Sequence, residues 1–391
     1  MRLKISTLTF VIFIINCLTG FAQSIDDIEY GTSSTLEIIS WNIENFPKNG
    51  NNTITKVGDI IEALDADIIA IQEVEDINSF NEMVEGLESY NGYLESSWFA
   101  GLAFIYNSNT IQVNDIYEIY TTSEYWSAFP RAPMIIDFNF KNKRYFVINN
   151  HLKCCGDGYL NMNSSNDEET RRYNASVLLQ EYVDDNLSEE NVIILGDLND
   201  ELSDEIQNNV FRTIIEDNNN YLFTDIDIAN GDISNWSFPN WPSHLDHIAI
   251  TNELFDEFEH ENSKIETLKI EEYLENGWND YDRYISDHRP VALKLFTDTN
   301  LSTSTENNSE YFFTNSPNPF QLETKFTFNT LIESSKIDIY NIHGQRITSL
   351  NINQNQSSVT FQTNNLANGV YFAKLIANDV VIASKKIVIL R

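Results

Sequence analysis

Cysteine is scarce in this chain, with three residues in 391, at positions 17, 154 and 155. This scarcity excludes a disulfide-rich scaffold and a structural zinc site built on several thiolates. Basic residues are scarce as well, since 24 Lys and Arg stand against 59 Asp and Glu, for a net charge of -35. Long apolar runs are missing after the N-terminal segment, so we expect no stable membrane span.

The negative charge is concentrated in the middle of the chain. Residues 1–22 carry +2 and residues 311–391 carry +3, so residues 23–310 carry -40. A broad basic surface for nucleic acid is excluded there, because the long-range field repels phosphate unless salt screens it. Any phosphate chemistry must therefore depend on a bound metal and a few local cations.

The first 22 residues have the pattern of a secretory signal peptide. Arg2 and Lys4 precede the apolar run Leu8 to Ile15, and Gly20-Phe21-Ala22 offers a cleavage site before Gln23. A membrane anchor is the alternative, but the run is short and interrupted. A lipoprotein signal through Cys17 is disfavoured because the bulky Asn16 precedes it.

Composition divides the remainder into two folded units. Residues 297–310 are rich in Thr, Asn and Ser and predict a linker between a domain at 23–296 and a domain at 311–391. In the first, strand-like runs alternate with helical patterns at Ile54 to Leu64 and Thr170 to Val183, which predicts an α/β fold. The second contains only strand patterns and turn residues, which predicts a small all-β sandwich.

Short polar signatures recur in the large domain, each beside an apolar run long enough for a buried strand. The signatures are Trp41-Asn42, Gln72-Glu73, Asn150-His151, Gly196-Asp197-Leu198-Asn199, Leu245-Asp246-His247 and Ser286-Asp287-His288. Polar groups at strand ends can converge on one rim of a fold. Carboxylates, amides and imidazoles gathered without thiolates are typical of a hydrolytic site for a hard metal ion.

Phosphodiester hydrolysis needs a cation, a base and help for the departing oxygen. Glu73 follows an apolar run, where a carboxylate favours a cation partner; a solvated acid at a strand end is the alternative. Asn42 can ligate the metal, fix its carboxylate, or serve only in a turn. His151 can protonate the leaving group or bind phosphate, or be a core histidine. Arg131 is one of few cations and suits a phosphate clamp or a surface ion pair.

Two further signatures offer proton transfer. Asp197 and Asn199 stand two residues apart, so in extended geometry they point to the same side; one then orients water while the other contacts phosphate. The alternative is a simple turn at residues 196–200. Asp287 and His288 place a carboxylate beside an imidazole, so that one binds metal while the other takes a proton. Asp246 is a candidate to hold that imidazole in one tautomer.

Together these signatures resemble the endonuclease/exonuclease/phosphatase (deoxyribonuclease I-like) superfamily over about 250 residues. The resemblance implies a four-layer α/β/β/α sandwich of two mixed sheets with the site at one rim. It implies Glu73 as the principal metal ligand, assisted by Asn42 and Asp287. It also implies Asp197 and Asn199 for nucleophile and phosphate, and His288 as base with Asp246 as its partner. His151 becomes the second catalytic histidine, and Mg²⁺ the expected cofactor, with Mn²⁺ or Ca²⁺ as alternatives.

The C-terminal domain carries a second resemblance. Ser316-Pro317-Asn318-Pro319-Phe320, residues 339–345, residues 366–371 and residues 385–388 resemble the C-terminal sorting domain of the type IX secretion system of Bacteroidota. The resemblance implies that this machinery is a partner and that the protein passes through the periplasm and outer membrane. We therefore expect a secreted or cell-surface protein.

Two local features leave alternatives open. His244 and His247 flank Leu245-Asp246 and imitate a zinc-binding pattern, although the superfamily pattern already uses Asp246. Cys154 and Cys155 follow His151 closely, and in a secreted chain they predict a vicinal disulfide, with two free thiols as the alternative.

The substrate prediction is DNA, or RNA, hydrolysed by a monomeric secreted nuclease, because two site histidines resemble those of the secreted deoxyribonucleases. A phospholipid or sphingomyelin phosphodiesterase is the first alternative, supported by the aromatic segments 117–129, 236–241 and 278–284. A sugar-phosphate or inositol-phosphate phosphatase is the second. A catalytically inactive exported binding protein is the third, although no site residue is missing.

Overall fold

The computed structural model describes residues 23–94, 101–297, 313–328, 335–341, 344–353, 356–363, 366–377 and 380–390. The predicted signal peptide at 1–22 and residues 298–310 of the predicted linker lie outside the described residues. The chain divides after Thr297 into two compact units, which are described separately. Among the described helices, none has the length and hydrophobicity needed to span a bilayer.

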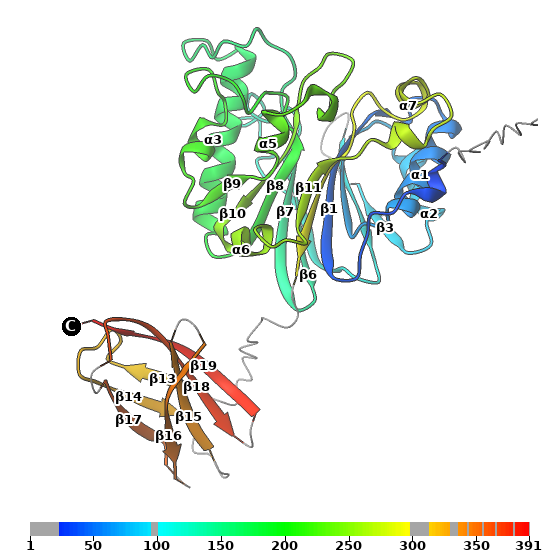
Figure 1. Ribbon diagram of the computed structural model, residues 1–391. Helices are drawn as coiled ribbons and strands as arrows, with labels where there is room; N and C mark the ends of the chain where they lie inside the picture. The colour runs from blue at the N-terminus through cyan, green and yellow to red at the C-terminus, as the bar shows by residue number, and fades with distance from the viewer. Residues whose placement is uncertain are drawn as a thin grey trace, which may run out of the picture. The chain divides into compact units, whose positions relative to one another are not determined.

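The N-terminal unit contains two six-stranded mixed sheets (Figure 1). The first has the strand order β11 (Lys264–Thr267), β12 (Val291–Phe296), β1 (Thr35–Phe46), β2 (Ile68–Val74), β4 (Gly101–Asn107) and β3 (Tyr90–Tyr93). The second has the order β5 (Gln112–Glu118), β6 (Met134–Phe140), β7 (Lys143–His151), β8 (Asn191–Asp197), β10 (Asp246–Thr251) and β9 (Tyr221–Phe223). Only β1 with β2 and β7 with β8 pair in parallel; the other pairs among these strands are antiparallel.

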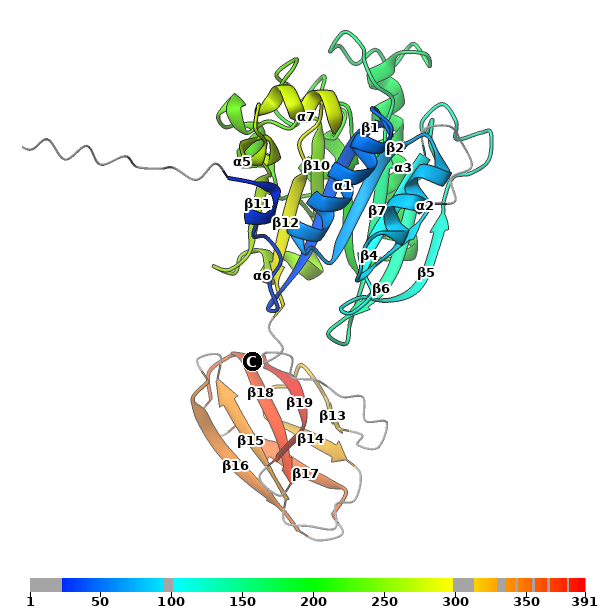
Figure 2. The ribbon, with the colours of Figure 1, turned by 90° about the vertical axis from the view of Figure 1, so that its right-hand side faces the viewer.

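Helices cover the outer faces of both sheets (Figure 2). The α-helices are α1 (Asn51–Leu64), α2 (Ile77–Glu85), α3 (Glu168–Asn186), α4 (Arg212–Glu216), α5 (Ile226–Ala229), α6 (Phe255–Phe258) and α7 (Trp278–Tyr284). Short 3₁₀ turns lie at Ile25–Asp27, Ile233–Asn235, Asn252–Leu254 and Ile270–Tyr273. One outer core packs α1, α2 and α7 on the first sheet, and the other packs α3 and α4 on the second. A third core fills the space between the sheets, which confirms the predicted four-layer α/β/β/α sandwich.

Strand periodicity decides which polar residues reach the space between the sheets. In β1, Leu36 and Ile38 belong to the core between the sheets, whereas Ile39 and Trp41 belong to an outer core. Because side chains alternate along a strand, Asn42 falls on the inner face. The same parity places His151 after Val147, Asp197 after Leu195, and Asp246 before Ile248 on inner faces.

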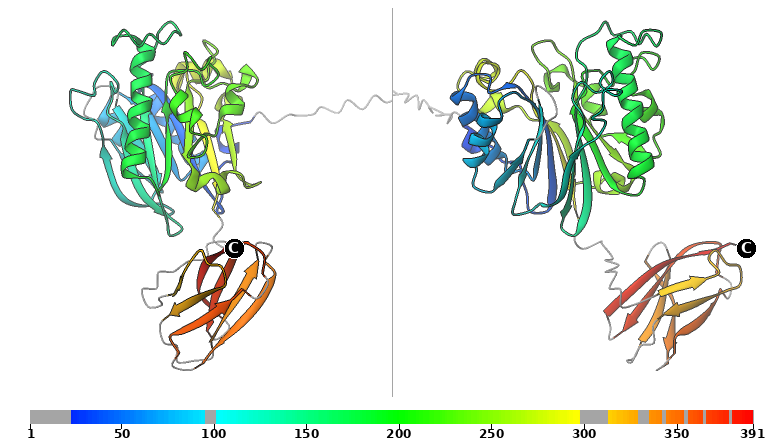
Figure 3. Two further views of the ribbon diagram at one scale, coloured as in Figure 1. Left: turned by 90° about the vertical axis from the view of Figure 1, so that its left-hand side faces the viewer. Right: turned by 180° about the vertical axis from the view of Figure 1, so that it is seen from behind.

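The C-terminal unit is entirely β in its described residues (Figure 3). One sheet has the order β13 (Phe313–Ser316), β14 (Glu323–Phe328) and β17 (Ser358–Gln362). The other has the order β16 (Arg346–Ile352), β15 (Ser335–Asn341), β18 (Gly369–Ala377) and β19 (Val380–Ile389). Both are antiparallel and share one core that contains Phe326, Ile339 and Leu375, which confirms the predicted sandwich.

Candidate active site

Three of the predicted site residues meet at one rim because of how the strands pair. Asp197 is in register with His151 across the parallel pair of β7 and β8, and with Asp246 across the antiparallel pair of β8 and β10. Gly196 makes the closeness of β7 possible, since a Cβ there would lie 1.9 Å from the carbonyl oxygen of Asn150. Three functional side chains therefore stand side by side at the end of the second sheet.

Asn42 joins the first sheet to this row. Its Nδ2 donates to Asp197 Oδ2 at 2.9 Å and to Glu73 Oε1 at 3.2 Å, while its Oδ1 accepts from the Glu44 amide at 2.9 Å. The amide oxygen is thus already bonded to the main chain. Of the two predicted roles, this geometry favours fixing the carboxylates over ligating a metal.

Glu73 reaches the rim through irregular backbone rather than through strand parity. It has a φ of 67°, in the left-handed region, and the pairing of β2 with both neighbours shifts register beside it. Its Oε2 accepts from the Asn45 amide at 2.9 Å, and Oε1 lies 3.8 Å from His151 Nε2. The carboxylate is partly exposed, so one of its sides remains open to solvent.

His288 and Asp246 form the tightest pair of the site. His288 Nδ1 donates to Asp246 Oδ2 at 2.7 Å, and Nε2 lies 3.9 Å from Asp197 Oδ2. The segment that carries His288 is tied to β1, because the Ser286 hydroxyl accepts from the His288 amide at 2.9 Å and donates to the Asn42 carbonyl at 2.6 Å. Nδ1 is occupied by Asp246, which leaves Nε2 to face the site.

His151 is buried and faces the same carboxylates. Its Nε2 lies 3.5 Å from Asp197 Oδ2, and its Nδ1 is buried without a hydrogen-bond partner among the described residues. Burial lowers the pKa of His151 well below its usual value, and the charges of Arg131 and His288 lower it further. His151 is therefore neutral. The positive charge of Arg131 acts on His151, which agrees with the predicted role of Arg131 in binding phosphate.

The prediction that Asp197 and Asn199 extend in one direction is wrong. Strand β8 ends at Asp197, and Asn199 has a φ of 56°, so the chain turns there. The Asn199 amide donates to Asp197 Oδ1 at 3.2 Å, and its Nδ2 donates to the Leu152 carbonyl at 3.3 Å. The side chain of Asn199 still belongs to the rim, but a turn and not a strand positions it.

Glu44, which belongs to none of the sequence signatures, lies beside Asp287. Glu44 has its pKa raised by burial and by the nearby negative charge of Asp287, while its ion pair with Lys48 lowers it. Asp287 Oδ1 lies 4.0 Å from His288 Nε2. The available signal was an acid two residues after Asn42, which the spacing alone did not distinguish from a loop residue.

Burial and mutual repulsion shift the remaining titrating groups. Burial raises the pKa of Asp197 to about 7; the charge of His288 lowers it, and Asp246 and Glu73 add to the rise. Burial lowers the pKa of His288, but Asp246 and Asp197 outweigh it and raise the value to about 10. The site thus combines a carboxyl that titrates near neutrality with an imidazolium and a neutral imidazole.

The donor set fits a hard divalent cation. Carboxylate oxygens of Glu73 and Asp197 lie within 4.8 Å of each other and of a ring nitrogen of His151, whereas the protonated His288 has no lone pair to offer a metal. Asp246 Oδ1 is buried with no hydrogen-bond partner in the described part of the chain. Several carboxylates held this close repel one another unless a cation lies among them, and oxygen ligands are those that Mg²⁺ prefers.

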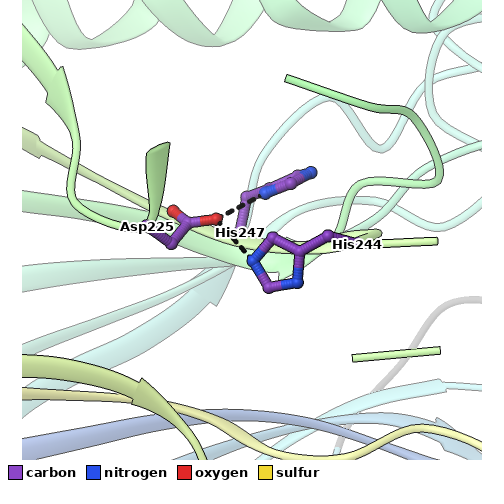
Figure 4. Close-up of side chains that lie close together, drawn as sticks. All are labelled: Asp225, His244 and His247. Atoms are coloured by element: carbon purple, nitrogen blue, oxygen red, sulfur yellow. Dashed lines mark hydrogen bonds and ion pairs between the residues drawn. The ribbon is translucent and has the colours of Figure 1, made fainter. Parts of the chain in front are cut away.

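A second buried cluster lies on the outer face of the same sheet (Figure 4). Asp225 Oδ2 accepts from His244 Nε2 at 3.0 Å and from His247 Nδ1 at 2.6 Å, and all three side chains are fully buried. His247 Nε2 lies 2.8 Å from the Asp200 carbonyl, which can only accept, so this nitrogen carries a proton as well. His247 is therefore an imidazolium, and its pKa is raised because Asp225 outweighs the lowering effect of burial.

This cluster does not fit a metal ion. Both nitrogens of His247 are protonated donors, and His244 Nδ1 accepts from the Ser237 amide at 3.3 Å. No imidazole lone pair is left over, which argues against the zinc alternative. The cluster instead ties β10 to the segment after β8 and to Ser237, whose hydroxyl accepts from the Asp246 amide at 3.2 Å.

Asp225→Asn tests this assignment as a stability prediction. We expect the free energy of unfolding to fall by about 3–5 kcal/mol, because the change leaves a buried imidazolium without its counter-charge. Asp232→Asn, at an exposed helix cap, is the control. Urea unfolding at neutral pH measures both. Equal stability of the two variants would contradict the buried ion pair, and loss of bound zinc from Asp225→Asn would favour the metal site instead.

The remaining candidates from the sequence are the two adjacent cysteines and the aromatic segments. Cys154 and Cys155 are exposed free thiols, three and four residues after His151. Of the aromatic segments, Trp236 and Trp278 donate to the Ile228 carbonyl and to Asn240, and Tyr120 stacks on Phe129. Most of these rings therefore pack within the fold.

Two family models match this chain. A family model described as the Endonuclease/Exonuclease/phosphatase family matches residues 39–288. A second model, described as a secretion system C-terminal sorting domain, matches residues 316–390. A search of curated proteins found no significant match.

Solved structures share the fold of the N-terminal unit at low sequence identity. TDP2 of D. rerio, humanized by 14 mutations, is 15% identical, with a TM-score of 0.51 and coverage of 68% of this chain and 100% of its own. D. rerio TDP2 complexed with a single strand DNA product is 14% identical, with the same TM-score and coverage. The human Nocturnin catalytic domain with a bound sulfate anion is 15% identical, with a TM-score of 0.50 and coverage of 68% and 95%.

Proposed function

This chain belongs to the endonuclease/exonuclease/phosphatase family, and from that premise we propose that it is an exported, metal-dependent phosphodiesterase whose preferred substrate is DNA. The observation that carries the proposal is the convergence of Glu73, Asp197 and the pair of His288 with Asp246 at one rim. The chain ends in a secretion system sorting domain, which directs export to the cell surface or the extracellular space.

Each residue of the rim has a part in phosphodiester hydrolysis. Glu73 and Asp287 would hold a divalent cation, which neutralises charge on the phosphate. Asn42 orients Glu73 and Asp197 through the two hydrogen bonds of its amide group. Arg131 and Asn199 bind phosphate oxygens, and neutral His151 donates a hydrogen bond from Nε2 or assists the leaving oxygen.

We assign the base to Asp197, in place of the prediction from sequence, which gave that role to His288. A base must be deprotonated at working pH, and a pKa of about 7 suits Asp197 to that task. His288, with a pKa of about 10, is an imidazolium at neutral pH. It therefore stabilises the negative charge that develops on the phosphate, with Asp246 fixing its ring.

The pH profile tests this assignment. We expect kcat/KM to rise with pH, with a midpoint near 7 or below it when Mg²⁺ is bound, because only the deprotonated form of Asp197 accepts a proton. Activity should fall again only toward pH 10, where His288 loses its charge. A profile measured with a soluble phosphodiester that showed no rise through neutrality would contradict Asp197 as the base.

DNA is preferred as substrate on chemical grounds. The rim offers Arg131 and an imidazolium for phosphate, and D. rerio TDP2 of the same fold has been solved with a single strand DNA product. The charge of -40 on residues 23–310 opposes DNA binding at low salt. We therefore expect DNA hydrolysis to require moderate salt or divalent cations, which screen that repulsion.

A lipid phosphodiester is the second candidate, favoured by exposed aromatic side chains. Trp126, Tyr159 and Trp241 are 52%, 69% and 78% exposed, and each lies in a segment between strands of the second sheet. Trp and Tyr are common in segments that enter a membrane interface. Such a substrate needs no basic surface, which suits the acidic unit.

Parallel assays on supercoiled plasmid, sphingomyelin vesicles and a soluble phosphomonoester separate these substrates. Plasmid nicking that EDTA abolishes supports the nuclease. Phosphocholine release with intact plasmid would move the protein to the lipid class, and hydrolysis of only the phosphomonoester would make it a phosphatase. Absence of hydrolysis of all three substrates would overturn the proposal and favour a binding protein.

A further inference from the structure

Two adjacent thiols lie in the segment that leaves the site after β7. Apart from Cys17, Cys154 and Cys155 are the only cysteines of the chain. Both are exposed, and their Sγ atoms lie 2.9 Å apart. An exported protein meets an oxidising environment, in which such a pair seldom stays reduced.

The main chain around the thiols is already held in place. One nitrogen of Arg172, Nη1, donates to the carbonyls of Lys153 and Cys155, at 2.6 Å each. Arg172 is itself buried, with Asp200 at 2.8 Å and Glu169 at 3.4 Å. The carbonyls on both sides of Cys154 are thus fixed, so little freedom remains to be lost when the two sulfurs join.

We propose that Cys154 and Cys155 form a vicinal disulfide after export and that this bond stiffens the loop at the edge of the active site. The oxidant is a low-molecular-weight disulfide, RSSR. Cys154 attacks one of its sulfurs, which forms a mixed disulfide and releases one RSH. Cys155 then attacks the Cys154 sulfur, loses its proton to solvent and releases the second RSH, so that two thiols are oxidised as one RSSR is reduced.

The loop is connected to the rim by direct hydrogen bonds. Leu152, which follows His151, accepts from Asn199 Nδ2 at 3.3 Å. Arg172 joins the loop to Asp200, the residue after Asn199, and the Asp200 carbonyl accepts from His247. A change in the stiffness of residues 152–155 is therefore transmitted to the turn that positions Asn199. This second part of the proposal rests on the proposed function.

Alkylation of the full-length protein tests the bond. After incubation with oxidised glutathione, the peptide that contains both cysteines should lack two hydrogen atoms and resist iodoacetamide until it is reduced. Cys154→Ser and Cys155→Ser are the controls, since each should either alkylate once or carry glutathione. Alkylation of both thiols in the glutathione-treated wild type would overturn the disulfide.

Activity of the same samples tests the coupling to the site. We expect reduction to lower kcat/KM by about threefold to tenfold, less than the ~100-fold that a misplacement of about 1 Å can cost. The double variant Cys154→Ser with Cys155→Ser should have the kcat/KM of the reduced protein, and reductant should not change that value. A wild type with equal activity in both states would overturn the coupling. Absence of any hydrolysis would refute the proposed function, while alkylation still decides the disulfide.

Discussion

Asp197→Asn is expected to lower kcat on a phosphodiester substrate by about 10²- to 10⁴-fold, because the amide cannot accept the proton of the attacking water. The change keeps the shape of the side chain and leaves an oxygen to accept from Asn42. Kinetics with saturating Mg²⁺ measure the loss. Asp256→Asn, an exposed aspartate of α6, is the matched control and should keep full activity.

The same variant has a stability signature that a misfolded protein would lack. The pKa of Asp197 is raised from 3.8 to about 7, so the folded state loses stability as the pH rises between these values and bears the full cost above pH 7. Asp197→Asn removes that cost, and in EDTA above pH 7 it should unfold at the same or higher urea concentration than wild type. An inactive variant that is also less stable would contradict this account.

Glu73→Gln is expected to lower activity by a similar factor at a fixed low Mg²⁺ concentration, because the principal oxygen ligand loses its charge. The loss should shrink as Mg²⁺ rises, since weaker binding is offset by mass action. Magnesium titration of the initial rate measures this shift. Glu75→Gln, which is exposed two residues further along, is the control.

For Glu73→Gln, the half-saturating Mg²⁺ concentration is the informative number. A rise of at least tenfold supports Glu73 as a metal ligand. An unchanged half-saturation with lower maximal rate would instead assign Glu73 to a role in catalysis without metal binding.

Much of the fold was predictable from the sequence because buried strands are continuous apolar runs. The run Val192 to Leu195 is apolar on both faces and forms most of β8, and the run Val291 to Phe296 is apolar except for Lys294 and forms β12. Strand β5 (Gln112–Glu118) has no such pattern, because it contains several polar residues. It lies at the edge of its sheet and is partly exposed. The polar signatures mark only strands that lie beside the site, so neither the edge strand β5 nor the buried interior strands β4 and β6 were predicted.

The membership of the site was predictable, but its geometry was not. Polar residues beside buried runs predicted Asp197, Asp246 and His288 as site residues, and the structure brings these three together at one rim. The left-handed backbone of Glu73 was not predicted, and that of Asn199 was foreseen only as the alternative of a turn at residues 196–200. The position of the Glu73 side chain depends on a hydrogen bond from the Asn45 amide that no spacing in the sequence encodes.

The difference between the two histidines also required the structure. A motif treats both histidines alike, whereas their environments shift their pKa values in opposite directions, down for His151 and up for His288. The difference arises from Arg131 on one side and from Asp246 and Asp197 on the other. Such partners come from distant parts of the chain and are brought together only by folding.

The most direct test of the account measures nicking of supercoiled plasmid by wild type and His288→Ala, each with Mg²⁺ and with EDTA. His260→Ala, a second histidine variant outside the rim, is the matched control. We predict nicking by wild type and His260→Ala that EDTA abolishes, and a loss of at least about 100-fold in His288→Ala. Equal nicking by His288→Ala, or nicking that survives EDTA, would contradict a metal-dependent phosphodiesterase at this rim.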